Sequence, residues 1–257
     1  MKAMILAAGL GTRLRPLTDN RPKALVEVAS RTLLEITLAR LRTFGVTEVI
    51  VNVHHFADMV VDYLNSHASF GMRVEVSREE ILLDTGGGLK KAAWFFLEDS
   101  SRLNEPFLLH NVDVISNIDL ASMLRFHNEN HALATLAVQD RETSRYLLFD
   151  EHLQLCGRRA GPRSGQGSHQ KSELVRSSPA LAQLQALAFS GIHVISPRLL
   201  PMITEEGVFS IIPSYLRLAA QGEKILAFRA DECYWRDLGR PADLAQAAHD
   251  LQQNVLL

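Results

Sequence analysis

A glycine-rich turn with two nearby cations is the part of the sequence best suited to chemistry. An apolar run from Ala3 to Leu10 predicts a buried first strand, which breaks at Gly9 and Gly11. Glycines in such a turn let the backbone approach a ligand and direct amide N–H groups into a concavity that accepts phosphate. Arg13 and Lys23 add positive charge near the same strand end. These residue types in this order predict a site for a nucleotide polyphosphate and chemistry at a phosphate.

Two familiar phosphate-binding motifs are excluded. The Rossmann dinucleotide fingerprint requires a third glycine where Leu14 stands, and the P-loop string G-x-x-x-x-G-K-[ST] does not occur in the chain. The alternative that remains is a pair of loop glycines beside ordinary surface basic residues. The position of Lys23, between Pro22 and a second apolar stretch, argues against that alternative.

A second glycine cluster lies at the start of a predicted helix. Gly86, Gly87 and Gly88 follow Asp84 and Thr85. Each glycine inside a helix costs about 1 kcal/mol relative to alanine, so three in succession indicate that something approaches the backbone closely.

These motifs resemble those of the sugar-1-phosphate nucleotidyltransferases. The family pattern L-A-A-G-x-G-T-R-L-x-P-L-T is matched from Leu6 to Thr18, and its P-K-P-L continuation reads P-K-A-L here, with Ala24 in place of a proline. The resemblance extends from Met1 to about Leu244. It is strongest to the short bacterial members, such as N-acetylmuramate-1-phosphate uridylyltransferases and heptose- or mannose-1-phosphate guanylyltransferases.

The resemblance implies transfer of a nucleoside monophosphate from a nucleoside triphosphate to a sugar 1-phosphate, with Mg²⁺ as cofactor and pyrophosphate as the second product. It assigns the metal to Asp113, although Val112 stands where close relatives have glycine, and to Asp237 in a W-x-D-[VIL]-G segment. Mg²⁺ usually takes one or two protein carboxylates, which fits this pair. Arg13 then holds the β- and γ-phosphates, and Lys23 contacts the α-phosphate.

The resemblance also assigns binding residues. Those for the nucleotide are Ala8, Gly9, Gly11, Thr12, Glu80, Thr85, Gly86 and Gly87, and those for the sugar are Asn111 and Gly191. Glu80 is expected at the nucleobase, where a carboxylate accepts one N–H from uracil or two from guanine. The alternatives are a plain charged loop at 78–80 and a packing role for the strand glycine. The family's E-K-P lysine is absent, and Arg145 is a candidate replacement.

The alternation of predicted strands and helices indicates one α/β domain over residues 1–257. We expect a three-layer, Rossmann-like nucleotidyltransferase fold, with a mostly parallel central sheet and helices on both faces. Ligands of such sheets bind beyond the carboxyl ends of the strands. The expected helices are 32–44, ended by Gly45, 57–64, 85–96, 120–129 and a C-terminal helix 244–257. The expected strands are 3–10, 49–53, 73–76, 107–110 and 132–138. A hairpin over 146–155 precedes an expected mobile loop over 157–178, whose Arg158, Arg159, Arg163 or Lys171 is a candidate to close over phosphate.

Bulk properties set the expected surroundings. A net charge of −2 over 257 residues argues against nonspecific nucleic-acid binding. No apolar run approaches the length of a membrane helix, and no signal peptide is evident. Cys156 and Cys233 have no metal-ligand spacing, which is typical of a reduced cytoplasmic protein. We therefore expect a cytoplasmic monomer or homodimer without nucleic-acid or membrane partners.

Two alternatives of a different kind stay open. One is a regulatory subunit that binds the nucleotide and has lost turnover; the retained Arg13, Lys23, Asp113 and Asp237 argue against it. The other is a transferase with a non-sugar acceptor such as phosphocholine, whose cation would favour aromatic residues such as Trp235.

Overall fold

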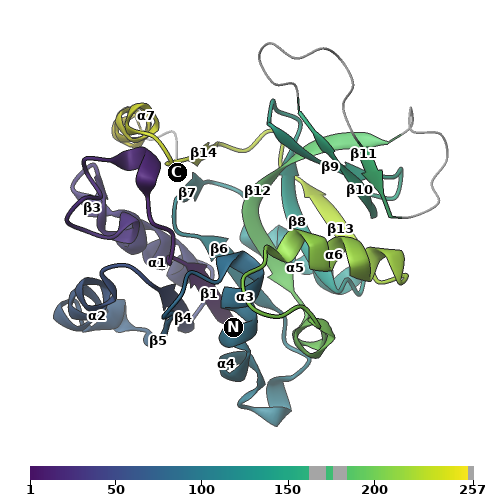
Figure 1. Cartoon of the computed structure of the whole chain (residues 1–257), viewed down its shortest axis with the longest axis horizontal. Coiled ribbons are helices and arrows are strands. Elements are labelled where there is room, and N and C mark those ends of the chain that lie inside the picture. Colours follow the sequence, from purple (N-terminus) through teal and green to yellow (C-terminus); the bar gives the residue numbers. More distant parts are fainter. Residues whose placement is uncertain (162–171, 176–183, 254–257) are drawn as a thin grey trace.

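The computed structural model describes residues 1–161, 172–175 and 184–253. These residues form a ten-stranded sheet in the order β11-β10-β9-β12-β6-β1-β4-β5, with β8 paired to both β12 and β13 (Figure 1). Its strands are β1 (Lys2–Leu6), β4 (Glu48–Val53), β5 (Arg73–Arg78), β6 (Phe107–Asn111), β8 (Ala134–Gln139), β9 (Arg145–Phe149), β10 (Leu155–Ala160), β11 (Ser172–Leu174), β12 (Gln185–Ile195) and β13 (Ile225–Arg229). Two short ribbons accompany it, β2 (Glu27–Val28) with β3 (Arg31–Thr32) and β7 (Val114–Ser116) with β14 (Trp235–Asp237).

The strands β6, β1, β4 and β5 are parallel neighbours, so their carboxyl ends lie at one edge of the sheet. This is the parallel arrangement expected of the central sheet. The long strand β12 is antiparallel to β6, β8 and β9, and it joins the parallel part to the β9–β11 extension at the other end of the sheet (Figure 1).

Helices cover both faces of the sheet. Successive residues of a strand point to opposite faces, and Ala3 and Ile5 of β1 accordingly belong to one apolar cluster while Met4 belongs to the other. The first cluster includes residues of α1 (Leu33–Thr43), α2 (Ala57–Ser66), α5 (Leu120–Glu129) and α7 (Pro241–Gln252). The second includes residues of α3 (Asp84–Lys91), α4 (Ala93–Leu97) and α6 (Ile211–Ala220). The expected three-layer α/β fold is confirmed.

Most expected elements form with small shifts in their bounds. The helix expected over 32–44 is α1, and Gly45 follows it with a φ of 77°, a left-handed conformation that ends helices. The helix expected over 85–96 is instead two, because α3 ends before Ala92 and α4 begins after it. No helix within the described residues has the length and apolar character needed to cross a membrane.

The segment after the hairpin differs from expectation where it is described. The strand β10 continues to Ala160, past the expected start of a loop at residue 157, and it pairs with β11. Arg158 is in this strand and forms an ion pair with Glu173 of β11. Arg163 and Lys171 lie outside the described residues. The C-terminal helix begins at Pro241 rather than residue 244; residues 254–257 are also outside the described range.

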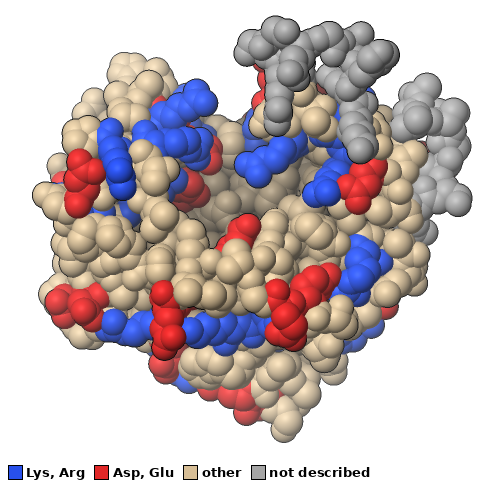
Figure 2. All heavy atoms as spheres, viewed as in Figure 1, with Lys and Arg blue, Asp and Glu red and all other residues tan. Residues whose placement is uncertain are grey.

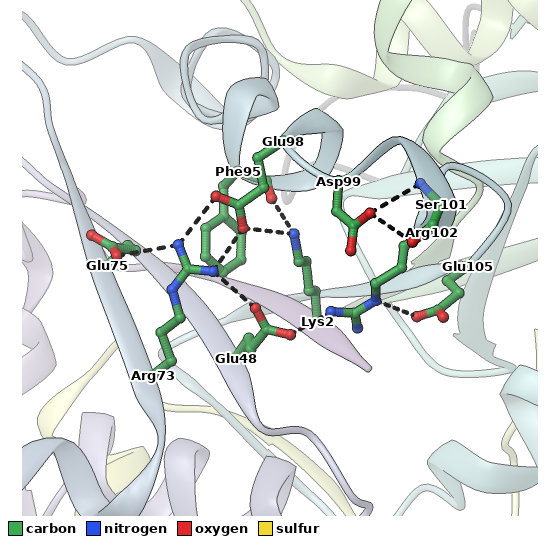
Figure 3. Close-up of polar contacts among 10 residues, drawn as sticks. All are labelled: Lys2, Glu48, Arg73, Glu75, Phe95, Glu98, Asp99, Ser101, Arg102 and Glu105. Atoms are coloured by element: carbon green, nitrogen blue, oxygen red, sulfur yellow. Dashed lines mark hydrogen bonds and ion pairs between the residues drawn. The ribbon is translucent and has the colours of Figure 1, made fainter.

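A network of ion pairs lies at the amino edge of the sheet (Figure 3). Lys2, Glu48 and Arg73 open β1, β4 and β5. Arg73 is 2.7 Å from Glu98 and 3.0 Å from Glu48, and Lys2 is 2.9 Å from Glu98. Arg102 completes the network on Glu48 at 2.5 Å. These charges are matched to one another and stand at the opposite edge from the carboxyl ends of the same strands.

Candidate active site

A cavity of about 250 Å³ opens at the carboxyl ends of β1 and β6. Its lining residues are Leu6, Ala7, Gly9, Gly11, Thr12, Arg13, Lys23, Val112, Asp113 and Gly239. Figure 2 shows this face hollowed, with Lys and Arg side chains on both sides of the hollow and acidic side chains within it. The site is therefore at the edge of the sheet where the fold predicts ligands.

The glycine turn forms one wall of the cavity. Gly11 has a φ of 65°, and its carbonyl oxygen accepts hydrogen bonds from the Leu14 N–H at 2.8 Å and the Thr18 hydroxyl at 2.9 Å. Leu14 is fully buried and anchors the 3₁₀ turn Thr12–Leu14, whereas the Arg13 side chain is more than half exposed. The turn thus has a fixed backbone with an exposed cation at its end.

Lys23 is a buried cation that faces this turn. Its side chain is 9% exposed, and its ammonium group donates a hydrogen bond to the Asp113 carboxylate. The following residues Ala24 and Leu25 are buried in the core, so the 3₁₀ turn that carries Lys23 is held in place. Asp113 lies two residues after the end of β6 and lines the same cavity as the glycine turn.

The second aspartate reaches the site through the ribbon of β7 and β14. Asp237 pairs with Val114, and the Leu238 N–H donates to the Asp113 carbonyl at 2.7 Å. Burial and the negative charge of Asp113 raise the pKa of Asp237. Arg13 is 3.8 Å from the Asp237 carboxylate.

The residues present suit Mg²⁺ in chemistry and number. No group of three or more His, Cys, Asp or Glu able to hold a metal occurs within residues 1–161, 172–175 and 184–253. Mg²⁺, however, is held by one or two carboxylates together with substrate phosphates and water. Two neighbouring carboxylates whose charges disfavour each other are what such a cation would stabilise.

The two residues expected at the sugar are brought into contact. Gly191 lies where β12 changes partner from β9 to β6, and its φ is 75°. A Cβ at this position would be 2.8 Å from the Asn111 amide nitrogen, at the end of β6. Both the positive φ that bends β12 here and the close approach of Asn111 favour glycine. The packing explanation for Gly191 is therefore supported, and its contact with the sugar stays a prediction.

The glycines at α3 are approached by the chain itself. A Cβ on Gly86 would be 2.4 Å from the Phe209 ring, and one on Gly87 would be 2.6 Å from the Gly207 carbonyl oxygen. The Gly86 N–H donates to the Phe209 carbonyl at 2.9 Å, and the Thr85 hydroxyl accepts from the Ile211 N–H at 3.0 Å. The segment 207–211 accounts for these glycines, so their contact with a nucleoside stays a prediction.

The structure contains a buried chain of hydrogen bonds that the sequence analysis did not predict. The Asn52 side chain accepts from the Ala7 N–H and donates to Glu79, both at 2.7 Å. The other Glu79 oxygen accepts from the Leu83 N–H at 2.9 Å. Glu79 is 4% exposed, whereas Glu80, the residue expected at the nucleobase, is exposed. A polar Asn52 inside the apolar run of β4 was the available signal.

The sequence analysis also did not predict that Arg141 lies near the site. Its guanidinium lies 3.6 Å from the centroid of the Trp235 ring, and its Nη2 donates to the Phe189 carbonyl at 2.8 Å. In the sequence it stands in a D-R-E run that any surface loop could carry. Arg145, the expected cation of this region, is exposed at the first residue of β9.

Comparison with known proteins identifies the family to which this fold belongs. A family model described as nucleotidyl transferase matches residues 2–151, more than half of the chain. The chain therefore belongs to the nucleotidyl transferase family, which confirms the resemblance drawn from its motifs.

Two curated relatives match over nearly the whole chain. An N-acetylmuramate alpha-1-phosphate uridylyltransferase of Caulobacter vibrioides is 34% identical, and the alignment covers 96% of this chain and 95% of the relative. A mannose-1-phosphate guanylyltransferase of Mycobacterium tuberculosis is 28% identical, with 98% of this chain and 65% of the relative covered. Among solved structures, HddC of Yersinia pseudotuberculosis in complex with GMP-PN superposes with a TM-score of 0.74 at 21% identity, covering 97% of this chain and 99% of that one. This last similarity concerns the fold.

Proposed function

We propose that the protein transfers a nucleoside monophosphate from a nucleoside triphosphate to a sugar 1-phosphate and releases pyrophosphate, in a reaction that requires Mg²⁺. The observation that carries the proposal is the grouping of Lys23, Asp113, Asp237 and Arg13 beside a glycine turn at the carboxyl edge of the sheet. The activities for which the two relatives are named, one on N-acetylmuramate 1-phosphate and one on mannose 1-phosphate, support the acceptor class.

In this reaction an oxygen of the acceptor phosphate attacks the α-phosphorus. The bond from the α-phosphorus to the bridging oxygen breaks, and that oxygen leaves with its electron pair as part of pyrophosphate. The attacking oxygen is anionic at neutral pH, so no general base is needed. Catalysis then consists of positioning two polyanions that repel each other and of neutralising charge as it develops.

The position of each residue at the site determines the role that we propose for it. Lys23, buried and held by Asp113, presents its ammonium group to the α-phosphate. Arg13 is exposed at the end of the glycine turn and can follow the mobile β- and γ-phosphates. The amides of Gly11 and Thr12 line the same wall of the cavity. Asp113 and Asp237 would hold Mg²⁺, which when bound supplies positive charge to the phosphate oxygens.

Pyrophosphate release measured with each of UTP, GTP, CTP and dTTP tests the proposal. Each triphosphate is combined with mannose, glucose, heptose or N-acetylmuramate 1-phosphate, or with phosphocholine, with and without Mg²⁺. We expect release only with one triphosphate, one sugar 1-phosphate and Mg²⁺ together. Release with phosphocholine alone would place the acceptor in another class. Tight triphosphate binding without release from any pair would contradict the proposal and favour a regulatory role.

A further inference from the structure

Arg141 follows β8 and is held at two points near the candidate active site. Its Nη2 donates to the Phe189 carbonyl at 2.8 Å, on the residue before the bend of β12. Its guanidinium plane lies against Trp235, with 3.6 Å between the central carbon and the ring centroid. The Trp235 indole N–H in turn donates to the Ser190 carbonyl at 2.7 Å. The guanidinium, the indole and the bend thus form one unit.

This unit connects the two sides of the expected acceptor site. Ser190 precedes Gly191, whose backbone lies against Asn111 at the end of β6. Trp235 is on β14, two residues before Asp237, and β14 is held to β7 beside Asp113. The cation is therefore bonded to the strand that carries Gly191 and stacked on the strand that carries Asp237.

The charge of Arg141 has only indirect compensation within the described part of the chain. Its Nε is buried without a hydrogen-bond partner, and its bonded acceptor is a neutral carbonyl oxygen. Burial lowers the pKa of Arg141, while the negative charge of Asp237 opposes that effect. A guanidinium that is partly removed from water without a carboxylate partner is stabilised when an anion joins it.

A reaction between two phosphates requires separate positive charges for each. Arg13 and Lys23 line the cavity of the glycine turn, on the side where the triphosphate is expected. Arg145, the alternative on the acceptor side, is exposed and pairs across the hairpin with Ala160. We propose that Arg141, stacked on Trp235, binds the phosphate group of the acceptor, the sugar 1-phosphate. This inference rests on the proposed function and adds the residue that recognises the second substrate.

Steady-state kinetics with the active substrate pair separate the acceptor from the triphosphate. We expect Arg141→Ala to raise the KM for the sugar 1-phosphate about ten- to a hundredfold, as for loss of a charge-assisted hydrogen bond, with the KM for the triphosphate within about twofold of wild type. Arg141→Lys keeps the charge but not the planar stack and should recover part of the loss. Arg125→Ala, which removes an exposed arginine of α5, is the matched control and should change neither constant.

Tryptophan fluorescence gives a reading that does not depend on turnover. The chain has two tryptophans, so Trp94→Phe leaves Trp235, the ring in contact with Arg141, as the reporter. Titration with each sugar 1-phosphate of the panel and with the matching free sugar should give a saturable change with a phosphorylated compound only. Arg141→Ala in the same background should weaken that binding at least tenfold.

The two readings keep the proposals apart. If the wild type turns over but Arg141→Ala leaves the acceptor KM unchanged, or raises both KM values equally, the acceptor site is wrong and the reaction stands. The same holds if Arg145→Ala alone raises the acceptor KM. If no pair releases pyrophosphate but Trp235 reports a sugar 1-phosphate whose binding requires Arg141, the reaction is wrong and the acceptor site stands. No saturable signal and no turnover would contradict both.

Discussion

Lys23 and Asp113 form an ion pair that is almost removed from solvent. Their side chains are 9% and 18% exposed. Such a pair contributes little net stability compared with apolar residues of the same volume, yet removing one partner leaves the other as an uncompensated charge. A pair placed at a cavity wall under these conditions is better explained by the charge that it presents to a ligand than by the stability of the fold.

Single and double substitutions separate those two roles. We expect Lys23→Met and Asp113→Asn each to lower kcat about 10²–10³-fold, because Lys23 meets the developing negative charge and Asp113 would hold the cation that also meets it. Lys23→Met should also lower the free energy of unfolding by about 3 kcal/mol, since Asp113 then lacks its cation. The double variant should regain much of that stability and none of the activity. Urea unfolding and pyrophosphate release measure the two quantities; recovery of turnover in the double variant would contradict the assignment.

Gly191 offers a second test at the scale of one residue. In Gly191→Ala the new methyl group must adopt a φ of 75° and meet the Asn111 amide nitrogen, 2.8 Å away. The left-handed conformation alone costs about 1–2 kcal/mol. We expect a lower unfolding free energy and a raised KM for the acceptor, with the KM for the triphosphate nearly unchanged. Gly45→Ala, which has a similar φ of 77° at the end of α1, controls for backbone strain and should affect stability only.

Three neighbouring strands end at the site, and Asn52 and Glu79 tie those ends together. Asn52 is in β4 and bonds the backbone just after β1. Glu79 follows β5 and bonds the backbone at Leu83, just before α3. A Cβ on Gly88 would be 2.7 Å from the Asn52 side chain, so this clamp also sets how closely α3 approaches. The glycine turn and the start of α3 are therefore positioned by one buried pair.

Substitution of the clamp should act at a distance from the phosphates. Asn52→Ala leaves one oxygen of the Glu79 carboxylate and the Ala7 N–H without partners, so we expect a loss of about 1–3 kcal/mol in unfolding free energy. The KM for the triphosphate should rise, because the backbone after β1 is then less well held. Glu79→Gln keeps the shape of the side chain and should be milder in both respects. Chemical denaturation measures the unfolding free energy, and kinetics at varied triphosphate concentration measure the KM. An unchanged KM in Asn52→Ala would show that Asn52 and Glu79 do not position the triphosphate site.

The sequence predicted those features that depend on local pattern. Gly45 ends α1, and the apolar runs of β1, β4 and β6 place Asp113 at a strand end, as expected. Glu79 was missed because one residue of register decides which side chain of a strand end points inward, and adjacent glutamates carry no signal for that choice. Arg141 and Phe209 were missed because their partners, Trp235 and Gly86, are distant in sequence and meet only when the sheet is assembled.

Basic side chains are compensated differently at the two edges of the sheet. At the amino edge each basic side chain of the network has a carboxylate within hydrogen-bond distance (Figure 3). At the carboxyl edge Arg13 is exposed, and Arg141 is bonded to a carbonyl oxygen. Charge at the first edge is therefore satisfied within the protein, whereas at the second edge Lys23 is paired with Asp113 and the charges of Arg13 and Arg141 are available to ligands. The same strands thus begin in a structural network and end in the site.

Three histidines buried in this assembly make its stability sensitive to acid. Burial lowers the pKa of His110 to about 4, that of His127 to about 4 and that of His193 to about 3, from 6.5. Nearby positive charge adds to the effect at His110, from Arg40, and at His127, from Arg198. Above pH 7 each histidine is neutral in both the folded and the unfolded chain, so stability there is independent of their protonation.

As the pH falls below 6.5 the unfolded chain takes up protons that the folded chain does not, and the free energy of unfolding decreases. For each buried histidine the loss between pH 7 and pH 5 is about 2 kcal/mol, and it levels off only below the folded pKa values. Urea unfolding at pH 7, 6 and 5 measures this slope. His193→Gln can still form a hydrogen bond with the Tyr215 hydroxyl. It should reduce the dependence of the unfolding free energy on pH by the contribution of one of the three histidines. His152→Gln replaces a histidine whose side chain is 83% exposed and should leave the slope unchanged. Equal slopes in the wild type and His193→Gln would show that His193 takes up its proton in the folded protein.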